Sequence, residues 1–248
     1  GWELQRSLAP LGELLACDFD TPGDLKADFS DPEALAALVR RVQPQIIVNS
    51  AAHTAVDKAE SEPDFARTLN ATAPGVLARE AAALGALLVH YSTDYVFDGS
   101  GSERRGEDAP TGPLSVYGRT KLEGEQLIRA SGCRHLILRT SWVYAARGGN
   151  FARTMLKLAA ERDSLKVISD QVGAPTGAEL LADVTAHAVR RVLAEPALAG
   201  LYHCVAGGET NWFEYARFVI EWARAHGQPV RVAPDAIHSI PTSDYPTP

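Results

Sequence analysis

Tyr91-Ser92-Thr93-Asp94-Tyr95-Val96-Phe97 is the stretch that decides the fold, together with Tyr117-Gly118-Arg119-Thr120-Lys121 further along the chain. The residues from Leu87 to Tyr91 form a short apolar run after Gly85, which is typical of a buried strand. Ser92 and Thr93 then stand where that strand ends. In open α/β sheets the ligand crevice lies outside the carboxyl ends of the strands. We therefore expect an α/β fold with a site at Thr93.

Tyr117 and Lys121 are four residues apart in a helical pattern that runs from Val116 to Ile128, so they share one helix face. A phenol has a pKa of about 10 and is a poor proton donor or acceptor near neutral pH. A neighbouring ammonium lowers that pKa because it stabilises the phenolate. We therefore expect Lys121 to lower the pKa of Tyr117, which would act as general acid or base on an oxygen that Thr93 also holds. The alternative is a solvated Tyr and Lys on a helix surface.

The composition limits the class of protein. The chain has 248 residues, the length of one large domain or of one and a half. Its hydrophobic content of 46% is enough for a sizeable core. A net charge of −7 and a pI near 5.5 argue against a nucleic-acid partner. No apolar run reaches the roughly 18 residues of a membrane span. The three cysteines share no close spacing, so we expect a reducing, cytoplasmic setting without disulfide or zinc site.

Strand and helix patterns alternate along the chain. They predict a Rossmann-type doubly wound parallel sheet, lacking its first strand, in residues 1–145. Residues 146–248 are expected to be a smaller C-terminal α/β part that contributes sheet strands and binds the substrate. Asp18 would end a strand over 14–18, where it is either the acid that binds an adenosine ribose or an ordinary loop residue. The polar segment 99–113 is expected to be a mobile loop. The other expected strands are 45–49, 135–140, 165–168 and 201–205.

Four motifs together resemble one family, the dTDP-4-dehydrorhamnose reductases of the extended short-chain dehydrogenases/reductases. The motifs are Val48–Glu60, His90–Phe97, Arg139–Tyr144 and Gly173–Leu180. The resemblance runs from residue 1 to residue 248. In the family a strand and a G-x-x-G-x-x-G turn precede the first helix, and Gly1 matches the last of these glycines. From this match we expect the sequence to be an internal fragment of such an enzyme.

The resemblance implies reduction of the 4-keto group of dTDP-4-dehydro-L-rhamnose by NADPH or NADH, in the cytoplasmic synthesis of L-rhamnose and lipopolysaccharide precursors. It implies that Thr93, Tyr117 and Lys121 are catalytic. The implied cofactor-binding residues are Gly1, Asp18, Asp28, Phe29, Ala51, Ala52, His53, Tyr91, Tyr117 and Lys121. The implied dTDP-sugar-binding residues are Thr54, Thr93, Asp94, Tyr95, Phe97 and Trp142.

Some implications leave alternatives open. Trp142 is either a stacking platform for the nucleotide sugar or a core aromatic residue. Some family members form a homodimer around Mg²⁺, which would place Glu3 and Glu179 at a metal. The alternative is that both are ordinary helix residues, Glu3 solvated and Glu179 favoured by the helix dipole. Alternative functions are a nucleotide-sugar epimerase or dehydratase of the same superfamily, or a non-catalytic dinucleotide-binding regulatory subunit. A dehydratase would need a second acid where Tyr95 stands.

Overall fold

The computed structural model describes residues 1–245, and their contacts divide the chain into two units. The first unit contains Gly1–Thr140 and Ala182–Cys204, and the second contains Ser141–Leu181 and the chain from Val205 onward. The chain thus leaves the first unit after Thr140 and returns to it for 182–204, a segment that we expected in the C-terminal part. Within the described residues no helix is both long and apolar enough to cross a membrane.

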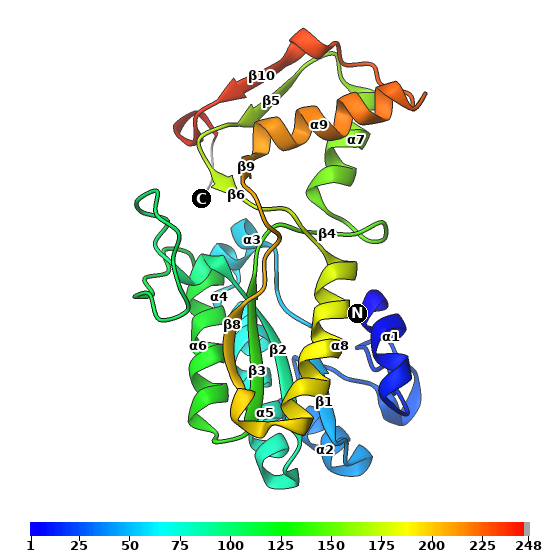
Figure 1. The fold of residues 1–248 in the computed structure, drawn as a ribbon, viewed down its shortest axis with the longest axis vertical. Coiled ribbons are helices and arrows are strands. Elements are labelled where there is room, and N and C mark those ends of the chain that lie inside the picture. The colour runs from blue at the N-terminus through cyan, green and yellow to red at the C-terminus, as the bar shows by residue number, and fades with distance from the viewer. Residues whose placement is uncertain (246–248) are drawn as a thin grey trace. The chain divides into compact units, whose positions relative to one another are not determined.

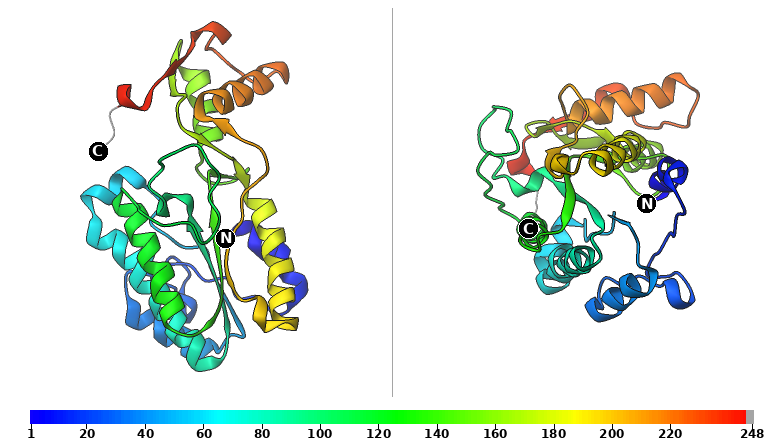
Figure 2. Two further views of the ribbon diagram at one scale, coloured as in Figure 1. Left: turned by 60° about the vertical axis from the view of Figure 1, so that its left-hand side comes forward. Right: turned by 60° about the horizontal axis from the view of Figure 1, so that its bottom comes forward.

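The first unit is built on one parallel sheet with the strand order β1-β2-β3-β8. The strands are β1 (Ile46–Asn49), β2 (Leu87–Thr93), β3 (Arg134–Thr140) and β8 (Gly200–His203). Helices lie on both faces: α5 (Ala73–Leu84) and α6 (Val116–Ala130) cover one face, and α8 (Ala178–Ala194) covers the other (Figures 1 and 2). This is the doubly wound arrangement that the alternating sequence pattern predicts.

The helices follow from cap residues and apolar stripes. In α2 (Pro32–Val42), for example, the Asp31 side chain accepts a hydrogen bond from the Ala34 N–H group, and Pro32 occupies the first turn. Aspartate is a preferred N-cap residue, and proline is common at the first position of a helix. The helices of the first unit are α1 (Trp2–Leu8), α2 (Pro32–Val42), α3 (Val56–Ser61), α4 (Pro63–Arg67), α5 (Ala73–Leu84), α6 (Val116–Ala130) and α8 (Ala178–Ala194), the last beginning in the second unit.

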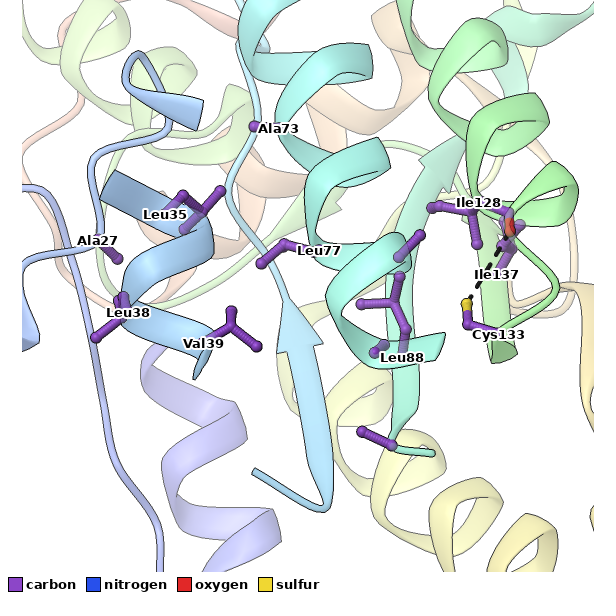
Figure 3. Packing of buried hydrophobic residues seen from close by; sticks show 13 residues of the cluster. Ala27, Leu35, Leu38, Val39, Ala73, Leu77, Leu88, Ile128, Cys133 and Ile137 are labelled. Carbon is purple, nitrogen blue, oxygen red and sulfur yellow. Dashed lines mark hydrogen bonds between the residues drawn. The ribbon is translucent and has the colours of Figure 1, made fainter. Parts of the chain in front are cut away.

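A buried apolar cluster joins α2, α5 and α6 to the sheet (Figure 3). Leu35, Leu77, Leu88, Ile128 and Ile137 are each no more than 3% exposed in it. A second cluster on the opposite sheet face packs β2 and β3 against α8. Because strand side chains alternate between faces, residues 88, 90 and 92 point toward α5 and α6, whereas 87, 89 and 91 point toward α8. This alternation decides which strand residues can meet α6.

One predicted strand is wrong. Residues 14–18 form no strand, and both Leu14 and Leu15 are exposed. A strand needs a neighbour for its backbone N–H and C=O groups, and no strand among residues 1–245 pairs with this segment. Cys17, Cys133 and Cys204 are free thiols in the structure, Cys133 buried and Cys17 exposed.

The second unit combines three small strand pairs with two helices. The pairs are β5 (Leu165–Ile168) with β10 (Ile237–Ile240), β4 (Val143–Tyr144) with β7 (Thr176–Gly177), and β6 (Val172–Gly173) with β9 (Thr210–Asn211). Helices α7 (Phe151–Glu161) and α9 (Trp212–Ala225) share a core with β5 and β10. Of the α9 aromatic residues, Trp212 and Phe213 pack on this core, whereas Phe218 and Trp222 are exposed.

Candidate active site

Thr93 lies where the sequence predicts it, at the carboxyl end of β2 and 5% exposed. Its hydroxyl oxygen accepts a hydrogen bond from the Tyr95 N–H group at 3.2 Å and lies 3.0 Å from Asp94 Oδ1, to which it donates. It therefore caps the short 3₁₀ turn Asp94–Val96 that follows the strand. These contacts fix the hydroxyl at the edge of the sheet where the crevice of an α/β fold lies.

Tyr117 reaches Thr93 because α6 begins directly against this turn. The Ser115 side chain caps the helix by accepting a hydrogen bond from the Gly118 N–H group at 3.0 Å. A Cβ atom at position 118 would collide with the Tyr95 carbonyl oxygen, so only glycine allows this approach. The phenol of Tyr117 is hydrogen-bonded with Thr93, and its ring lies 5.4 Å from the Tyr95 ring. The predicted meeting of Thr93 and Tyr117 is thus present.

The predicted lowering of the Tyr117 pKa by Lys121 is wrong for the structure described. Burial raises the pKa of Tyr117 to about 12, and the hydrogen bond with Thr93 offsets only part of that increase. Asp94 raises the pKa further because its negative charge disfavours a phenolate. The helix pattern placed both residues on one face, but it did not reveal how deeply that face is buried. Tyr117 is consequently a protonated phenol at neutral pH.

Lys121 is buried in the same helix and is only 2% exposed. Its Nζ donates a hydrogen bond to the Tyr91 carbonyl oxygen at 2.6 Å and lies 3.1 Å from His90 Nε2. Burial lowers the pKa of Lys121 to about 8, and the nearby Glu125 carboxylate acts in the opposite direction. The alternative of a solvated Tyr and Lys on a helix face is therefore excluded.

A buried ion pair next to Lys121 was not predicted from the sequence. Glu125 lies one turn beyond Lys121, and its two oxygens accept hydrogen bonds from Arg139 Nε at 2.9 Å and Nη2 at 2.7 Å. The Ser92 hydroxyl donates to the same carboxylate at 2.5 Å. Two signals could have revealed this pair: an arginine inside an apolar strand, and a glutamate on the Lys121 helix face. The pair joins α6 to β2 and β3 beneath the site.

The residues after β1 are brought to the same edge of the sheet. His53 is buried, its N–H group donates to Asn70 Oδ1 at 2.8 Å, and the Asn70 Nδ2 donates back to the His53 carbonyl oxygen at 3.0 Å. The ring atom His53 Nδ1 has no hydrogen-bond partner in the part of the chain that is described. A Cβ atom built on Gly1 would lie 3.8 Å from Ser50 Oγ, which places Gly1 beside the end of β1.

The other predicted cofactor residues are spread around this edge. Asp28 accepts hydrogen bonds from Ser30, which together with Lys26 lower its pKa to about 2. Phe29 packs against the core cluster below α2. Asp18 is exposed and accepts a hydrogen bond from the Phe19 N–H group at 2.7 Å. The Tyr91 hydroxyl is paired with Thr185 of α8 at 2.6 Å, so its side chain points away from Lys121.

The predicted substrate residues of the first unit continue from Thr93. Burial raises the pKa of Asp94, and Tyr95 is 39% exposed. The Phe97 ring has Arg105 and Arg139 over it at 5.4 and 5.2 Å. Arg105 also donates to Asp98 at 2.6 Å. Within segment 99–113, which we expected to be a mobile loop, Arg105 thus contacts the Phe97 ring by a cation–π interaction and forms an ion pair with Asp98.

Trp142 and Glu179 belong to the second unit. The Trp142 ring stacks on Trp212 at 3.5 Å, and a Cβ atom on Gly173 would lie 2.6 Å from the same ring. Trp142 also has a φ of 45°, a left-handed conformation that is unusual for this residue type. Glu179 is exposed, and Glu3 of the first unit pairs with Arg6 at 3.4 Å. Within residues 1–245 no three His, Cys, Asp or Glu side chains come together as a metal site.

A parallel Rossmann-type sheet that ends at Thr93, followed by a helix that carries Tyr117 and Lys121, defines the class of short-chain dehydrogenases/reductases. A family model described as "RmlD substrate binding domain" matches residues 1–248. The chain belongs to the dTDP-4-dehydrorhamnose reductase family.

Relatives and solved structures agree with this assignment. The chain is 57% identical to the dTDP-4-dehydrorhamnose reductase of Escherichia coli over 248 residues, which cover 100% of this chain and 82% of the relative. It is 44% identical to the Bacillus subtilis spore coat polysaccharide biosynthesis protein SpsK, over 88% of this chain and 72% of that protein. The crystal structure of a Clostridium acetobutylicum dTDP-4-dehydrorhamnose reductase matches with a TM-score of 0.85 and 36% identity, covering 100% and 82% of the two chains.

A second crystal structure bears on the cofactor. The Bacillus anthracis dTDP-4-dehydrorhamnose reductase, solved in complex with NADP, matches with a TM-score of 0.78 and 33% identity over 88% of this chain and 74% of that chain. The expected family and the Rossmann-type fold are thereby confirmed.

Proposed function

We propose that this chain catalyses the NAD(P)H-dependent reduction of the 4-keto group of dTDP-4-dehydro-L-rhamnose to dTDP-L-rhamnose. The observation that carries the proposal is the hydrogen-bonded pair of Thr93 and Tyr117 above a buried Lys121, in a member of the dTDP-4-dehydrorhamnose reductase family. A regulatory subunit would have no need to keep a buried lysine and a buried phenol together, since each costs free energy to desolvate.

The residues after β1 fit a dinucleotide. Gly1, Ala51 and Ala52 leave space for a close approach of phosphate and ribose to the backbone. His53 Nδ1 is a buried polar atom that a bound ligand could satisfy. Once bound, NADPH or NADH supplies the hydride. The residues that would hold it are Gly1, Asp18, Asp28, Phe29, Ala51, Ala52, His53, Tyr91, Tyr117 and Lys121.

The proton transfer follows from the state of Tyr117. Thr93 and the Tyr117 phenol donate hydrogen bonds to the keto oxygen and hold it in place. As the oxygen gains negative charge it becomes a stronger base than a phenolate, so a phenol with a pKa of about 12 can protonate it. Burial therefore keeps Tyr117 in the form that a reduction needs. Lys121 holds the backbone of β2 beneath the phenol through the Tyr91 carbonyl.

The nucleotide sugar is proposed to contact the chain segment that follows Thr93, together with Thr54 and Trp142. The residues are Thr54, Asp94, Tyr95, Phe97 and Trp142. If Trp142 is a stacking platform, Trp142→Ala raises the Michaelis constant for the dTDP-sugar and leaves that for NADPH nearly unchanged. An equal loss for both substrates would identify Trp142 as a structural residue, held by Trp212 and Gly173.

The assay for the function is the oxidation of NADPH or NADH by the protein with dTDP-4-dehydro-L-rhamnose, with dTDP-L-rhamnose identified as product. Keto-sugar consumption without net oxidation of the cofactor would favour an epimerase, and no turnover with cofactor bound would favour a regulatory subunit.

We also propose a cytoplasmic homodimer in which Glu3 and Glu179 bind Mg²⁺, a role in lipopolysaccharide precursor synthesis, and no nucleic-acid partner. Sedimentation with Mg²⁺ and with EDTA, including Glu179→Gln, tests the metal and the dimer.

A further inference from the structure

Two buried polar side chains, Asn49 and His90, continue inward from Lys121 and have no role in the reaction proposed above. Asn49 of β1 and His90 of β2 are register partners in the parallel sheet. Asn49 Nδ2 lies 3.0 Å from His90 Nδ1, and His90 Nε2 lies 3.1 Å from Lys121 Nζ. Asn49 is 3% exposed, and His90 is fully buried. An imidazole therefore joins the amide on one strand to the lysine on α6.

The orientation of the Asn49 amide fixes the direction of this chain. Its Oδ1 accepts a hydrogen bond from the Ala51 N–H group at 2.9 Å. A backbone N–H group can only donate, so the oxygen must face Ala51 and the NH₂ group must face His90. His90 Nδ1 then accepts. A neutral imidazole carries one proton, which must sit on Nε2 and point at Lys121.

This tautomer conflicts with a charged Lys121. An ammonium group has only donors, so it would face the Nε2–H group with another N–H. A neutral amine has a lone pair that accepts the Nε2–H and still donates to the Tyr91 carbonyl oxygen. A charged His90 would not relieve the conflict, because an imidazolium still carries the Nε2 proton, and burial holds the pKa of the imidazole well below its usual range.

The other charged groups around Lys121 are accounted for by partners of their own. Glu125 on α6 favours the ammonium, but both of its oxygens are held by Arg139 of β3, and Ser92 of β2 adds a third hydrogen bond. Asp94 accepts from Thr93. Other ionisable side chains on α3, α4 and α6 bind groups other than Lys121. Lys58 forms an ion pair with Glu62, and Arg67 forms one with Glu123. Glu60 accepts a hydrogen bond from the Val116 N–H group.

We propose that Asn49 and His90 are positioning residues for Lys121: the amide of Asn49 fixes the imidazole with Nε2 protonated, and the imidazole favours the neutral amine of Lys121 over its ammonium. The proposal concerns the site of the proposed reduction, and its consequence for catalysis rests on that function. The hydrogen-bonded chain itself does not depend on any substrate. Through Asn49 and His90, strands β1 and β2 thus help to set the charge of Lys121 on α6.

The test is nitrogen-15 NMR of the histidine rings in the whole protein, because a protonated and an unprotonated ring nitrogen have well-separated shifts. In the wild type we expect His90 to have Nε2 protonated and Nδ1 unprotonated. The opposite tautomer would overturn the proposal. Because this spectrum needs neither a substitution nor turnover, it decides the matter even if the protein proves inactive with dTDP-sugars or if a variant fails to fold.

Asn49→Asp gives the second measurement. A carboxylate can only accept, so Nδ1 must carry the proton and Nε2 must accept from the Lys121 ammonium. The His90 tautomer should invert, and the midpoint of the Lys121 titration, followed at its Cε, should rise by about one pH unit or more. His135→Gln is the matched control, since His135 lies on β3 and its Nδ1 is 2.9 Å from the Cys133 carbonyl oxygen. An unchanged tautomer and midpoint in folded Asn49→Asp would overturn the proposal.

Discussion

Arg139→Met should cost far more stability than any exposed arginine substitution in this chain. Arg139 and Glu125 are 5% and 2% exposed at their side chains, and two hydrogen bonds of 2.9 and 2.7 Å join them. Removing the guanidinium leaves a buried carboxylate with only the Ser92 hydroxyl. Breaking a buried pair from one side costs roughly 3–5 kcal/mol. For a chain of this length that corresponds to a fall in melting temperature of roughly 6–20 °C.

The measurement is thermal and urea unfolding of the wild type, Arg139→Met and a control. Arg67→Met is a suitable control because Arg67 also binds a glutamate on α6, Glu123, but is 58% exposed at its side chain, so its loss should cost far less than the loss of Arg139. Arg139→Met combined with Glu125→Leu should regain at least half of the loss, because no buried charge then remains. A loss below about 1 kcal/mol for Arg139→Met alone would refute the reasoning.

Two further predictions concern α6. Gly124→Ala should destabilise the protein by several kcal/mol, because a Cβ atom there would collide with the Asn70 carbonyl oxygen. The control Gly106→Ala should change stability little, because no atom lies within 4 Å of a Cβ atom at that position. Equal melting temperatures for the two variants would contradict this. Burial lowers the pKa of Lys121 from 10.5 to about 8, so between these pH values the unfolded state binds the extra proton and stability rises with pH. The unfolding free energy of the wild type minus that of Lys121→Met should therefore rise by about 3 kcal/mol between pH 8 and pH 10.5. A difference that does not change with pH, measured by urea unfolding, would contradict this.

The strand-end site could be predicted from the sequence because its signals are local. An apolar run that ends in Ser92-Thr93 defines a strand and its carboxyl end, and the spacing of Tyr117 and Lys121 defines one helix face. The strand has a repeat of two residues and the helix a repeat of about four, and tertiary contacts rarely change these local repeats. The structure brings Thr93 and Tyr117 together as these periods indicate.

The remaining features depend on burial and on distant partners. Segment 14–18 has the composition of a strand, but strand formation depends on a neighbour that composition cannot supply. The pKa of Tyr117 depends on how closely β2, Asp94 and Tyr95 enclose the phenol. The pair of Glu125 and Arg139 joins residues 14 apart on different elements, and the sequence pattern of either element alone does not indicate it.

The most direct test of the account is the turnover of Tyr117→Phe with dTDP-4-dehydro-L-rhamnose and NADPH, measured beside the wild type. Phenylalanine keeps the ring contact with Tyr95 and removes only the hydroxyl that is hydrogen-bonded with Thr93. We predict that turnover falls by roughly 100-fold or more, the usual contribution of a general acid, while the affinity for the sugar nucleotide changes little. Oxidation of NADPH by Tyr117→Phe at close to the wild-type rate would contradict the assignment of Tyr117 as the proton donor.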